Sequence, residues 1–352
     1  MNKPDKPMIQ TEPEPRVTRR PVWYWILAAL LATVLLLLAV RGVSWQEMID
    51  TLRQSDPLII GLILLAITVN LFLRGLRWGI LLSGEHKLQP LTMFWATADG
   101  YLGNALLPAR AGELIRSAIV GLKTGVGTSF VLATALTERI IDAVVLVLVG
   151  LFLLPGISGL PAWVPAALRV MAAAGTIGLL LFLLLPYIED TIRKILTRLP
   201  LPDLWKEKLN GILGRFVLGT RAFVNPARAA GFLAFTPVIW LFDGFITVEL
   251  AKAMSLSLSL SQALLLMVAL GLASALPSTP GYVGIYQFVA TTILPVFGMT
   301  RSEALTFIIV YQGLGILLYL FWGLISLPVL NIKPSELRQP LELHPEKKDD
   351  VG

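Results

Sequence analysis

The feature of this sequence that most constrains its fold is a series of long apolar runs, each with few charged residues. An α-helix needs ~20 apolar residues to cross the hydrocarbon core of a bilayer, and several runs reach that length. The predicted spans lie near residues 22–40, 58–82, 128–154, 164–185, 231–253 and 304–330. We therefore predict an all-α polytopic membrane protein with about six full transmembrane helices.

Composition supports this class and excludes several others. Hydrophobic residues make up 55% of the chain and charged residues 15%, with a mean hydropathy of +0.74, which is more apolar than soluble domains are. The chain has no cysteine and only two histidines, His86 and His344, so we expect no metal site and no cofactor. The net charge of +6 does not indicate nucleic acid, because the basic residues flank the apolar runs.

The polar segments divide the chain into a membrane domain and two tails. Residues 1–21 are rich in proline and charge, and we predict a disordered cytoplasmic tail there. Residues 22–330 form the integral membrane domain, and residues 331–352 form a second cytoplasmic tail. Within the domain, residues 187–228 hold eight Lys or Arg residues against four acidic residues, so this loop is placed in the cytoplasm.

The same charge pattern predicts a multi-pass protein of the cell membrane with both termini in the cytoplasm. The loop 187–228 is also expected to be amphipathic, because its apolar residues follow helical spacing. These residues are Trp205, Leu209, Ile212, Leu213 and Phe216.

One apolar segment is interrupted where a simple helix would continue: DGYLGNALLPARAGELIR, from Asp99 to Arg116. Glycines and one proline break it, and lipid cannot hydrogen-bond the backbone groups that such breaks release. The break must therefore be buried in protein or line a wet cavity. Because each half is shorter than the ~20 residues of a full crossing, we predict a re-entrant helix pair.

Three charged residues around this break share one side of a short helix, since Arg110, Glu113 and Arg116 are spaced by three. The free N–H groups and dipole of a helix N-terminus, together with Arg110, are suited to binding a phosphate. The alternative interpretation is an ion-paired loop just outside the membrane.

Charged residues also lie inside two of the spans. Arg74 and Arg77 share a helix side near the end of the second span, where they either extend to the lipid headgroups or serve the site. In the third span, Glu138 and Asp142 lie four apart with Arg139 between them. A charge near the bilayer centre costs ~2.5–3.5 kcal/mol, so these residues are expected to be paired structurally or to act directly.

A second apolar segment, residues 261–298, is broken at ALPSTPGYVGIYQ. Its Leu276-Pro277-x-x-x-Gly281 repeats the pattern Leu107-Pro108-x-x-x-Gly112 of the first break. The predicted topology opens the first pair to the cytoplasm and the second to the outside. Two Pro/Gly-broken re-entrant helix pairs in such an inverted repeat point to the central binding site of a transporter.

At these residues the chain resembles a known family, the flippase-like integral membrane domain of lysylphosphatidylglycerol synthases. The matching pieces are LRGLRW (73–78), GYLGNALLPARAGELIR (100–116), TERIID (137–142) and LPSTPGYVGIYQ (276–287). Where the family has a PGGxGxxE-like pattern, this chain has Tyr282 and Val283 after the glycine and Gln287 at the acidic position. No polar loop is long enough to be the soluble synthase domain, so a member without that domain is expected.

The charges and the resemblance together predict one substrate-binding site. Its residues are Arg74, Arg77, Asn104, Arg110, Glu113, Arg116, Glu138, Arg139, Asp142, Gly281, Tyr282 and Gln287. The resemblance implies movement between leaflets of a lipid with a polar headgroup. The expected ligand is an anionic membrane phospholipid or a polyprenyl-phosphate-type lipid.

Two other functions stay open at this point. One is a membrane enzyme that acts on a lipid carrier, with Glu113, Glu138 or Asp142 as general base. The other is a non-catalytic partner of envelope-biosynthesis enzymes. We expect no catalytic activity, and the chain has no GxxxxGK[ST] motif for an ATP-driven mechanism.

Overall fold

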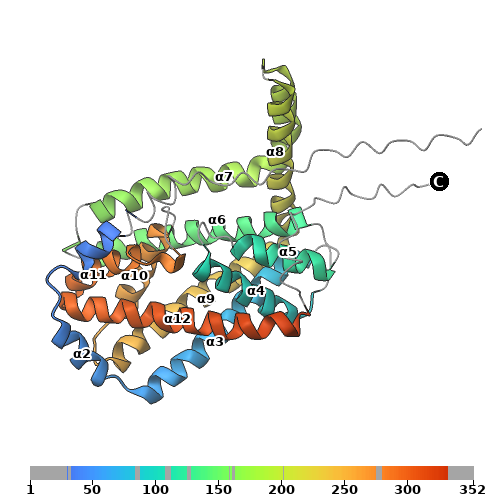
Figure 1. Ribbon diagram of the computed structural model, residues 1–352. Coiled ribbons are helices and arrows are strands. Elements are labelled where there is room, and N and C mark those ends of the chain that lie inside the picture. The colour runs from blue at the N-terminus through green and yellow to red at the C-terminus, as the bar shows by residue number, and fades with distance from the viewer. Residues whose placement is uncertain are drawn as a thin grey trace, which may run out of the picture.

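The computed structural model describes residues 30, 33–83, 88–107, 112–124, 128–157, 159–160, 163–200, 202–274 and 280–331. Arg110 and the tail segments 1–21 and 332–352 lie outside these residues, as does part of the first predicted span. The described chain is helical and contains no strand, which confirms the all-α class (Figure 1).

Five segments are long and apolar enough to cross a membrane: Pro57–Leu82, Phe130–Gly156, Val164–Leu181, Pro226–Ala253 and Arg301–Val329. They belong to α3 (Pro57–Leu82), α6 (Thr128–Leu153) with the short η2 (Leu154–Gly156), α7 (Trp163–Arg198), α9 (Pro226–Ala253) and α12 (Arg301–Val329). This confirms a polytopic membrane protein. Residues 30 and 33–40 of the remaining predicted span are helical, and its full length stays a prediction.

The ends of these long helices are set by local sequence signals. Asp56 accepts hydrogen bonds from two backbone N–H groups at the start of α3, and Pro57 fills a position where no backbone donor is needed. Asn225 and Pro226 repeat this arrangement at α9. The backbone N–H of Asp56 also donates to the Ala253 carbonyl at 2.8 Å, so α3 begins where α9 ends and the two helices run antiparallel.

Both broken segments form pairs of short helices. The first comprises α4 (Pro90–Leu106) and α5 (Gly112–Thr124). The second comprises α10 (Leu260–Ala273) and α11 (Ile285–Ile293), with the turn η3 (Pro280–Tyr282) before α11 and η4 (Leu294–Phe297) after it. None of the four reaches the length of a full crossing.

Two hydrophobic clusters place these pairs at opposite ends of the bundle. One cluster joins the end of α3, at Leu82, to Met93 of α4 and Ile119 of α5. The other joins the first part of α3, at Ile63, to Leu266 of α10 and Ala290 of α11. The opposed placement is the one that an inverted arrangement requires, whereas the side of the membrane from which each pair opens stays a prediction.

The two breaks meet inside the bundle. Gly281 of η3 has a φ of +65°, a conformation that glycine adopts most readily, and a Cβ at this position would lie 3.5 Å from the carbonyl oxygen of Ala105. Ala105 lies at the end of α4, just before the first break. Segments that are more than 170 residues apart in sequence, and that enter from opposite ends, thus come together at one place.

The predicted cytoplasmic loop 187–228 is helical throughout most of its length. Its first part continues α7 as far as Arg198, and α8 (Asp203–Val224) follows. Val217 is buried where α8 packs against α6, whereas Trp205 is exposed near the other end. Figure 1 shows α8 lying across the direction of the bundle and extending beyond it.

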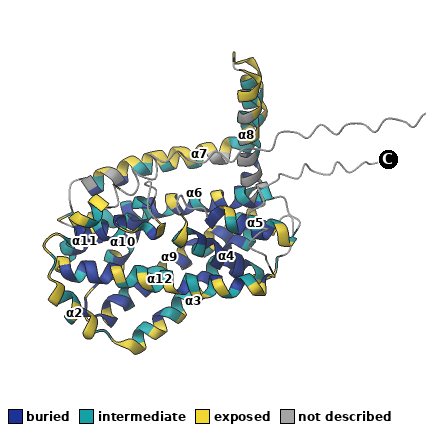
Figure 2. Cartoon of the chain, in the orientation of Figure 1, coloured by how far each residue is buried: buried dark blue, intermediate teal, exposed yellow. Residues whose placement is uncertain are grey.

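Short α2 (Trp45–Arg53) covers the end of the bundle where α12 begins. Figure 2 shows buried residues concentrated on α4 and α5 and the inner faces of their neighbours, while α7 is exposed along most of its length. The exposed residues of its span include the large apolar side chains of Val170, Ile177, Leu180 and Leu181, which suit contact with lipid.

Candidate functional site

Arg77 of α3 is completely enclosed, with no exposed side-chain surface. Its Nη1 lies 2.6 Å from Oδ1 of Asp142, and its Nη2 lies 2.6 Å from Oε1 of Glu138; both carboxylates come from α6. Nη1 also donates to Thr236 of α9 at 3.3 Å. The interpretation that Arg77 extends to the lipid headgroups is therefore wrong, because protein surrounds the guanidinium group.

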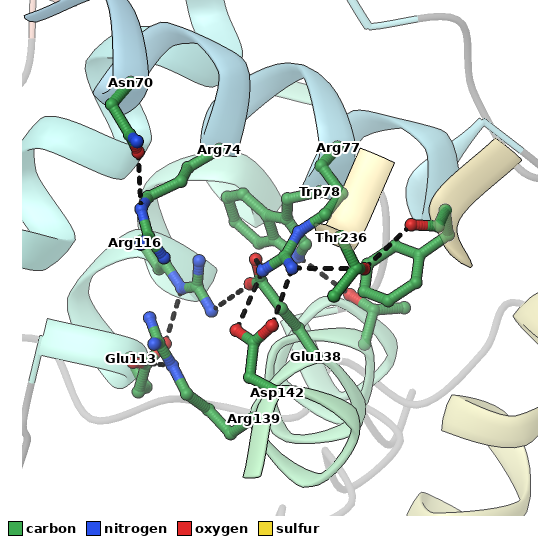
Figure 3. A network of polar contacts seen from close by, with 12 residues as sticks. Asn70, Arg74, Arg77, Trp78, Glu113, Arg116, Glu138, Arg139, Asp142 and Thr236 are labelled. Atoms are coloured by element: carbon green, nitrogen blue, oxygen red, sulfur yellow. Dashed lines mark hydrogen bonds and ion pairs between the residues drawn. The ribbon is translucent and has the colours of Figure 1, made fainter. Parts of the chain in front are cut away.

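Glu138 connects Arg77 to the first break. Its Oε2 accepts a hydrogen bond from Nη2 of Arg116 at 2.8 Å. The Nε of Arg116 lies 2.6 Å from Oε2 of Glu113, an ion pair by distance without hydrogen-bond alignment. Oε1 of Glu113 accepts from Nε of Arg139 at 2.8 Å. Charges thus alternate from α3 through α6 to α5 (Figure 3).

A further ion pair lies beside this chain of charges. Arg74 of α3 pairs with Asp243 of α9, and its Nε donates to Asn70 at 2.9 Å. Asn70 in turn donates to the backbone carbonyl of Ile239 at 3.3 Å. Sequence reasoning did not place Asp243 in the site. It lies 169 positions from Arg74, and the sequence does not show that α3 and α9 are neighbours.

The charged network, as we call it, consists of four arginines and four carboxylates. They are Arg74, Arg77, Arg116, Arg139, Glu113, Glu138, Asp142 and Asp243. Aromatic rings cover two of the cations: the guanidinium carbon of Arg116 lies 4.4 Å from the ring centroid of Trp78, and that of Arg77 lies 4.9 Å from Phe232. Within this set every charge has an opposite partner, so the site is electrically balanced.

The first break is closed by a contact that only glycine permits. A Cβ on Gly112 would lie 1.8 Å from the carbonyl oxygen of Gly100, so α4 and α5 touch backbone to backbone. Asn104 of α4 accepts from the Gly112 N–H at 3.0 Å and donates to Glu113 at 3.5 Å. This fixes the start of α5, and with it the position of Glu113. Arg110, the residue predicted to bind phosphate most directly, lies outside the described residues.

A cavity of about 290 Å³ lies between the two breaks. Seven of the predicted site residues line it: Arg74, Asn104, Glu113, Arg139, Asp142, Gly281 and Tyr282. Arg77, Arg116 and Glu138 are not among the lining residues; they lie behind this wall and hold its charged members in place. The volume is close to the lower end of the range for ligand pockets, ~300–1,000 Å³.

The cavity is polar toward one end and apolar toward the other. Along α3, Arg74 on the wall is preceded by Ile67 and Ile63, up to three helical turns away. Along the antiparallel α9, Asp243 is followed by Ile246. Charged groups therefore gather near the first break, and aliphatic side chains gather toward the start of α3.

Gln287, the last predicted site residue, secures the second break rather than lining the cavity. Its Oε1 accepts from the N–H of Gly284 at 2.7 Å, and its Nε2 donates to Oε1 of Gln312 at 2.6 Å. Gln312 of α12 donates to the carbonyl of Gly281. The second half thus supplies neutral amides where the first half supplies ion pairs.

The charged residues of the third predicted span are paired within the protein: Glu138 and Asp142 both face Arg77, and Glu138 also faces Arg116 of the first break. Asp142 lines the cavity as well. Glu113 and Arg116, which follow the first break, are buried among the helices and ion-paired.

Comparison with known proteins agrees with this architecture. The family model of the lysylphosphatidylglycerol synthase TM region matches residues 25–323. The chain belongs to this family. It is therefore a membrane protein of the lysylphosphatidylglycerol synthase TM family, as the resemblance implied. No solved structure matches the chain.

Three relatives of this chain include one named glycosyltransferase and two UPF0104 membrane proteins. A glycosyltransferase of Haloferax volcanii, AglD, is 26% identical over 90% of this chain, and the chain spans 56% of the length of AglD. A UPF0104 membrane protein of Methanothermobacter thermautotrophicus is 26% identical over 76% of this chain and 82% of the relative. A UPF0104 membrane protein of Methanocaldococcus jannaschii is 22% identical over 67% of this chain and 97% of the relative.

Proposed function

We propose that this protein binds a lipid with a polar headgroup in the cavity between its two breaks and moves it between the leaflets. The observation that carries the proposal is the cavity itself, which has a charged end and an aliphatic end in one enclosure. A lipid has the same division, because its headgroup needs hydrogen bonds and its tails need an apolar surface. The two helix pairs lie at opposite ends of the bundle, and their breaks meet inside it, which supports alternating access around this cavity.

The chain is further proposed to leave the covalent structure of the lipid unchanged. Glu113 and Glu138, two of the possible general bases, are each paired with two arginines. An arginine partner stabilises the ionised form of a carboxylate and so makes it a weaker proton acceptor. The ligands that we propose are a membrane phospholipid or a polyprenyl-phosphate-type lipid, including anionic ones, and envelope-biosynthesis enzymes are the proposed source or destination of that lipid.

The test is lipid movement in reconstituted vesicles, followed by chemical quenching of a fluorescent lipid in the outer leaflet. Ala143 of α6 lines the cavity, so Ala143→Trp should fill it without changing any charge. Leu148→Trp is the matched control, because Leu148 lies on the same helix and is 52% exposed on the outside of the bundle.

We expect the wild type and Leu148→Trp to move the lipid and Ala143→Trp to be at least tenfold slower. Equal rates for all three proteins, or no movement by the wild type above protein-free vesicles, would contradict the proposal. Recovery of the lipid with an altered headgroup would instead support an enzyme.

The proposed orientation places both termini and α8 in the cytoplasm of a cell-membrane protein. Glu207 is exposed on α8, and Gly156 is exposed in η2, just after the C-terminal end of α6. A cysteine at either position should fit and be reached by a reagent. In intact cells, a membrane-impermeant thiol reagent should label Gly156→Cys and not Glu207→Cys. The reverse pattern would overturn the orientation. Because the native chain has no cysteine, the background is low.

A further inference from the structure

Aromatic side chains gather on the cavity wall in a way that a phosphate site does not require. Five of the seven tyrosines of the protein line the cavity: Tyr101, Tyr282, Tyr286, Tyr311 and Tyr319. Trp240 joins them, so the rings come from both halves of the chain. An aromatic ring presents a flat apolar face, and the tyrosine hydroxyl both donates and accepts hydrogen bonds. Such a wall suits a ligand that carries hydroxyl groups on a compact C–H framework.

The charges on the wall are already matched to each other. Arg74 pairs with Asp243, Arg139 pairs with Glu113, and Asp142 pairs with Arg77 behind the wall. A bare phosphate group is bound best by guanidinium groups that have no other anionic partner. A paired carboxylate keeps unused lone pairs, and a paired guanidinium keeps unused N–H donors. Together they offer acceptors and donors side by side, which is what a hydroxyl group needs.

A quaternary ammonium headgroup is also disfavoured by the geometry. The guanidinium carbon of Arg74 lies 5.1 Å from the ring centroid of Trp240 and 6.0 Å from that of Tyr101. Arg139 lies 5.8 Å from the same ring of Tyr101. The protein's own cations therefore lie on the ring faces that would attract a cationic ligand.

Two tyrosine hydroxyls supply a specific recognition element. The rings of Tyr101 on α4 and Tyr319 on α12 lie 4.9 Å apart, and both line the cavity. Neither hydroxyl makes a hydrogen bond to another residue in the part of the chain that the structure describes. Both hydroxyls are therefore available to a ligand that carries hydroxyl groups.

We propose that the part of the lipid headgroup that the cavity recognises is an uncharged polyhydroxylated group, such as a hexose, in preference to a bare phosphate or a quaternary ammonium group. This inference rests on the proposed function, since it identifies the headgroup that the same cavity holds. The matched charges, the aromatic wall and the two tyrosine hydroxyls carry it.

The test is competitive lipid binding, measured by native mass spectrometry on the purified full chain. The protein is kept in a detergent without a sugar headgroup, because a sugar detergent would compete for the cavity. An equimolar mixture offers hexosyl-diacylglycerol, phosphatidic acid and phosphatidylcholine with identical acyl chains; methyl glucoside is added in a separate sample as the tail-free probe. We expect at least tenfold enrichment of the hexosyl lipid over the other two, and at least tenfold weaker binding of methyl glucoside.

Substitutions locate the selection in the cavity. Tyr319→Phe and Tyr101→Phe keep the ring and remove the hydroxyl, so each should reduce hexosyl-lipid enrichment at least threefold and leave phosphatidic acid unchanged. Tyr187→Phe is the control, because Tyr187 is 84% exposed on α7. An equal loss for all lipids in the two cavity variants would overturn the proposed role of the hydroxyls.

The remaining outcomes separate this inference from the proposed function. Enrichment of phosphatidic acid or phosphatidylcholine that Ala143→Trp abolishes would overturn the headgroup selection and leave lipid binding in place. Binding of methyl glucoside as tight as that of the hexosyl lipid would identify a soluble sugar and overturn the lipid-linked ligand. Lipid retention that Ala143→Trp does not change would overturn both proposals.

Discussion

The two breaks of this protein have the same role in the architecture but are built from different chemistry. At the first break, Glu113 is held by two arginines, and the backbones of α4 and α5 touch at Gly112. At the second break, Gln287 and Gln312 hold the turn η3 by neutral hydrogen bonds. The cavity is therefore lined by ion-paired side chains near the first break, and by Gln312 and tyrosines near the second.

This difference predicts that the two breaks differ in how much free energy is needed to move their residues apart. A neutral hydrogen bond contributes ~0.5–1.5 kcal/mol net, whereas separating a buried ion pair costs ~3–5 kcal/mol because it leaves an unpaired charge. We therefore expect the first break and the charged network to stay together during a transport cycle. Rearrangement should occur at the second break, where glycine at 281 and the amide hydrogen bonds allow other backbone conformations.

The largest effect is expected from removing the central cation of the charged half. Arg77→Met leaves Glu138 and Asp142 buried without their main partner, so the free energy of unfolding should fall by about 3–5 kcal/mol. Thermal unfolding of the purified protein, together with its expression level, measures this.

The matched control for this change is Arg193→Met. Arg193 pairs with Glu189 on α7, but its side chain is 40% exposed, so the loss should be below about 1 kcal/mol. Equal thermal stability of the two variants would show that the charged network does not hold the first half together.

The second comparison concerns the glycine at each break. In Gly112→Ala the new Cβ meets a rigid backbone carbonyl, so α4 and α5 must separate, and we expect a loss of at least about 1–3 kcal/mol. In Gly281→Ala the nearest atoms lie at 3.3 and 3.5 Å, and the main cost is the left-handed backbone, about 1–2 kcal/mol. In thermal unfolding, Gly112→Ala should have a lower melting temperature than Gly281→Ala. Gly178→Ala, with no atom within 4 Å, should be unchanged or slightly stabilised, and the reverse ranking of the two breaks would contradict the comparison.

Much of this fold could be predicted from the sequence, because its signals are local. The length of the apolar runs indicated the long helices. Asp56 before Pro57 marks the start of a helix, and this signal can be read from the two residues themselves. The breaks were visible because Pro108 and Gly112 interrupt an apolar run. The side of the membrane was inferred from charge alone, and the helix packing does not test it.

The partners within the site could not be predicted, because they depend on which helices are neighbours. Arg77 meets Asp142 across 65 positions, and Arg74 meets Asp243 across 169. The tyrosines of the cavity come from α4, η3, α11 and α12, and no local pattern shows that these elements meet. Gln287 was placed in the site from its position in a family pattern, yet its contact with Gln312 shows that it supports the backbone of the turn.

An acidic residue at position 287 would test how far the second half depends on neutral chemistry. In Gln287→Glu, the oxygen that accepts from Gly284 is kept, but the donor to Gln312 is replaced by a second acceptor 2.6 Å from the Gln312 oxygen. Gln312 cannot turn its amide without losing its bond to Gly281, so we expect a loss of about 1–2 kcal/mol in thermal unfolding. The same change at the exposed Gln46 is the control. Unchanged stability of Gln287→Glu would show that the second break accepts a charge as readily as the first.

The smallest effect on stability and the most informative effect on binding are expected at Asp243, which lines the cavity and pairs with Arg74. Asp243→Asn keeps the shape and an acceptor for Arg74 but removes one negative charge, so the charged network changes from balanced to a net charge of +1. Because the side chain of Asp243 is 21% exposed, the loss of stability should be only about 1 kcal/mol. The surplus positive charge should raise the share of phosphatidic acid bound from the lipid mixture several-fold, since an arginine without its carboxylate is available to a phosphate group. Asp243→Glu restores the charge and should return the lipid preference to that of the wild type. If Asp243→Asn binds the same lipids in the same proportions as the wild type, charge balance at this pair does not control which headgroup the cavity accepts.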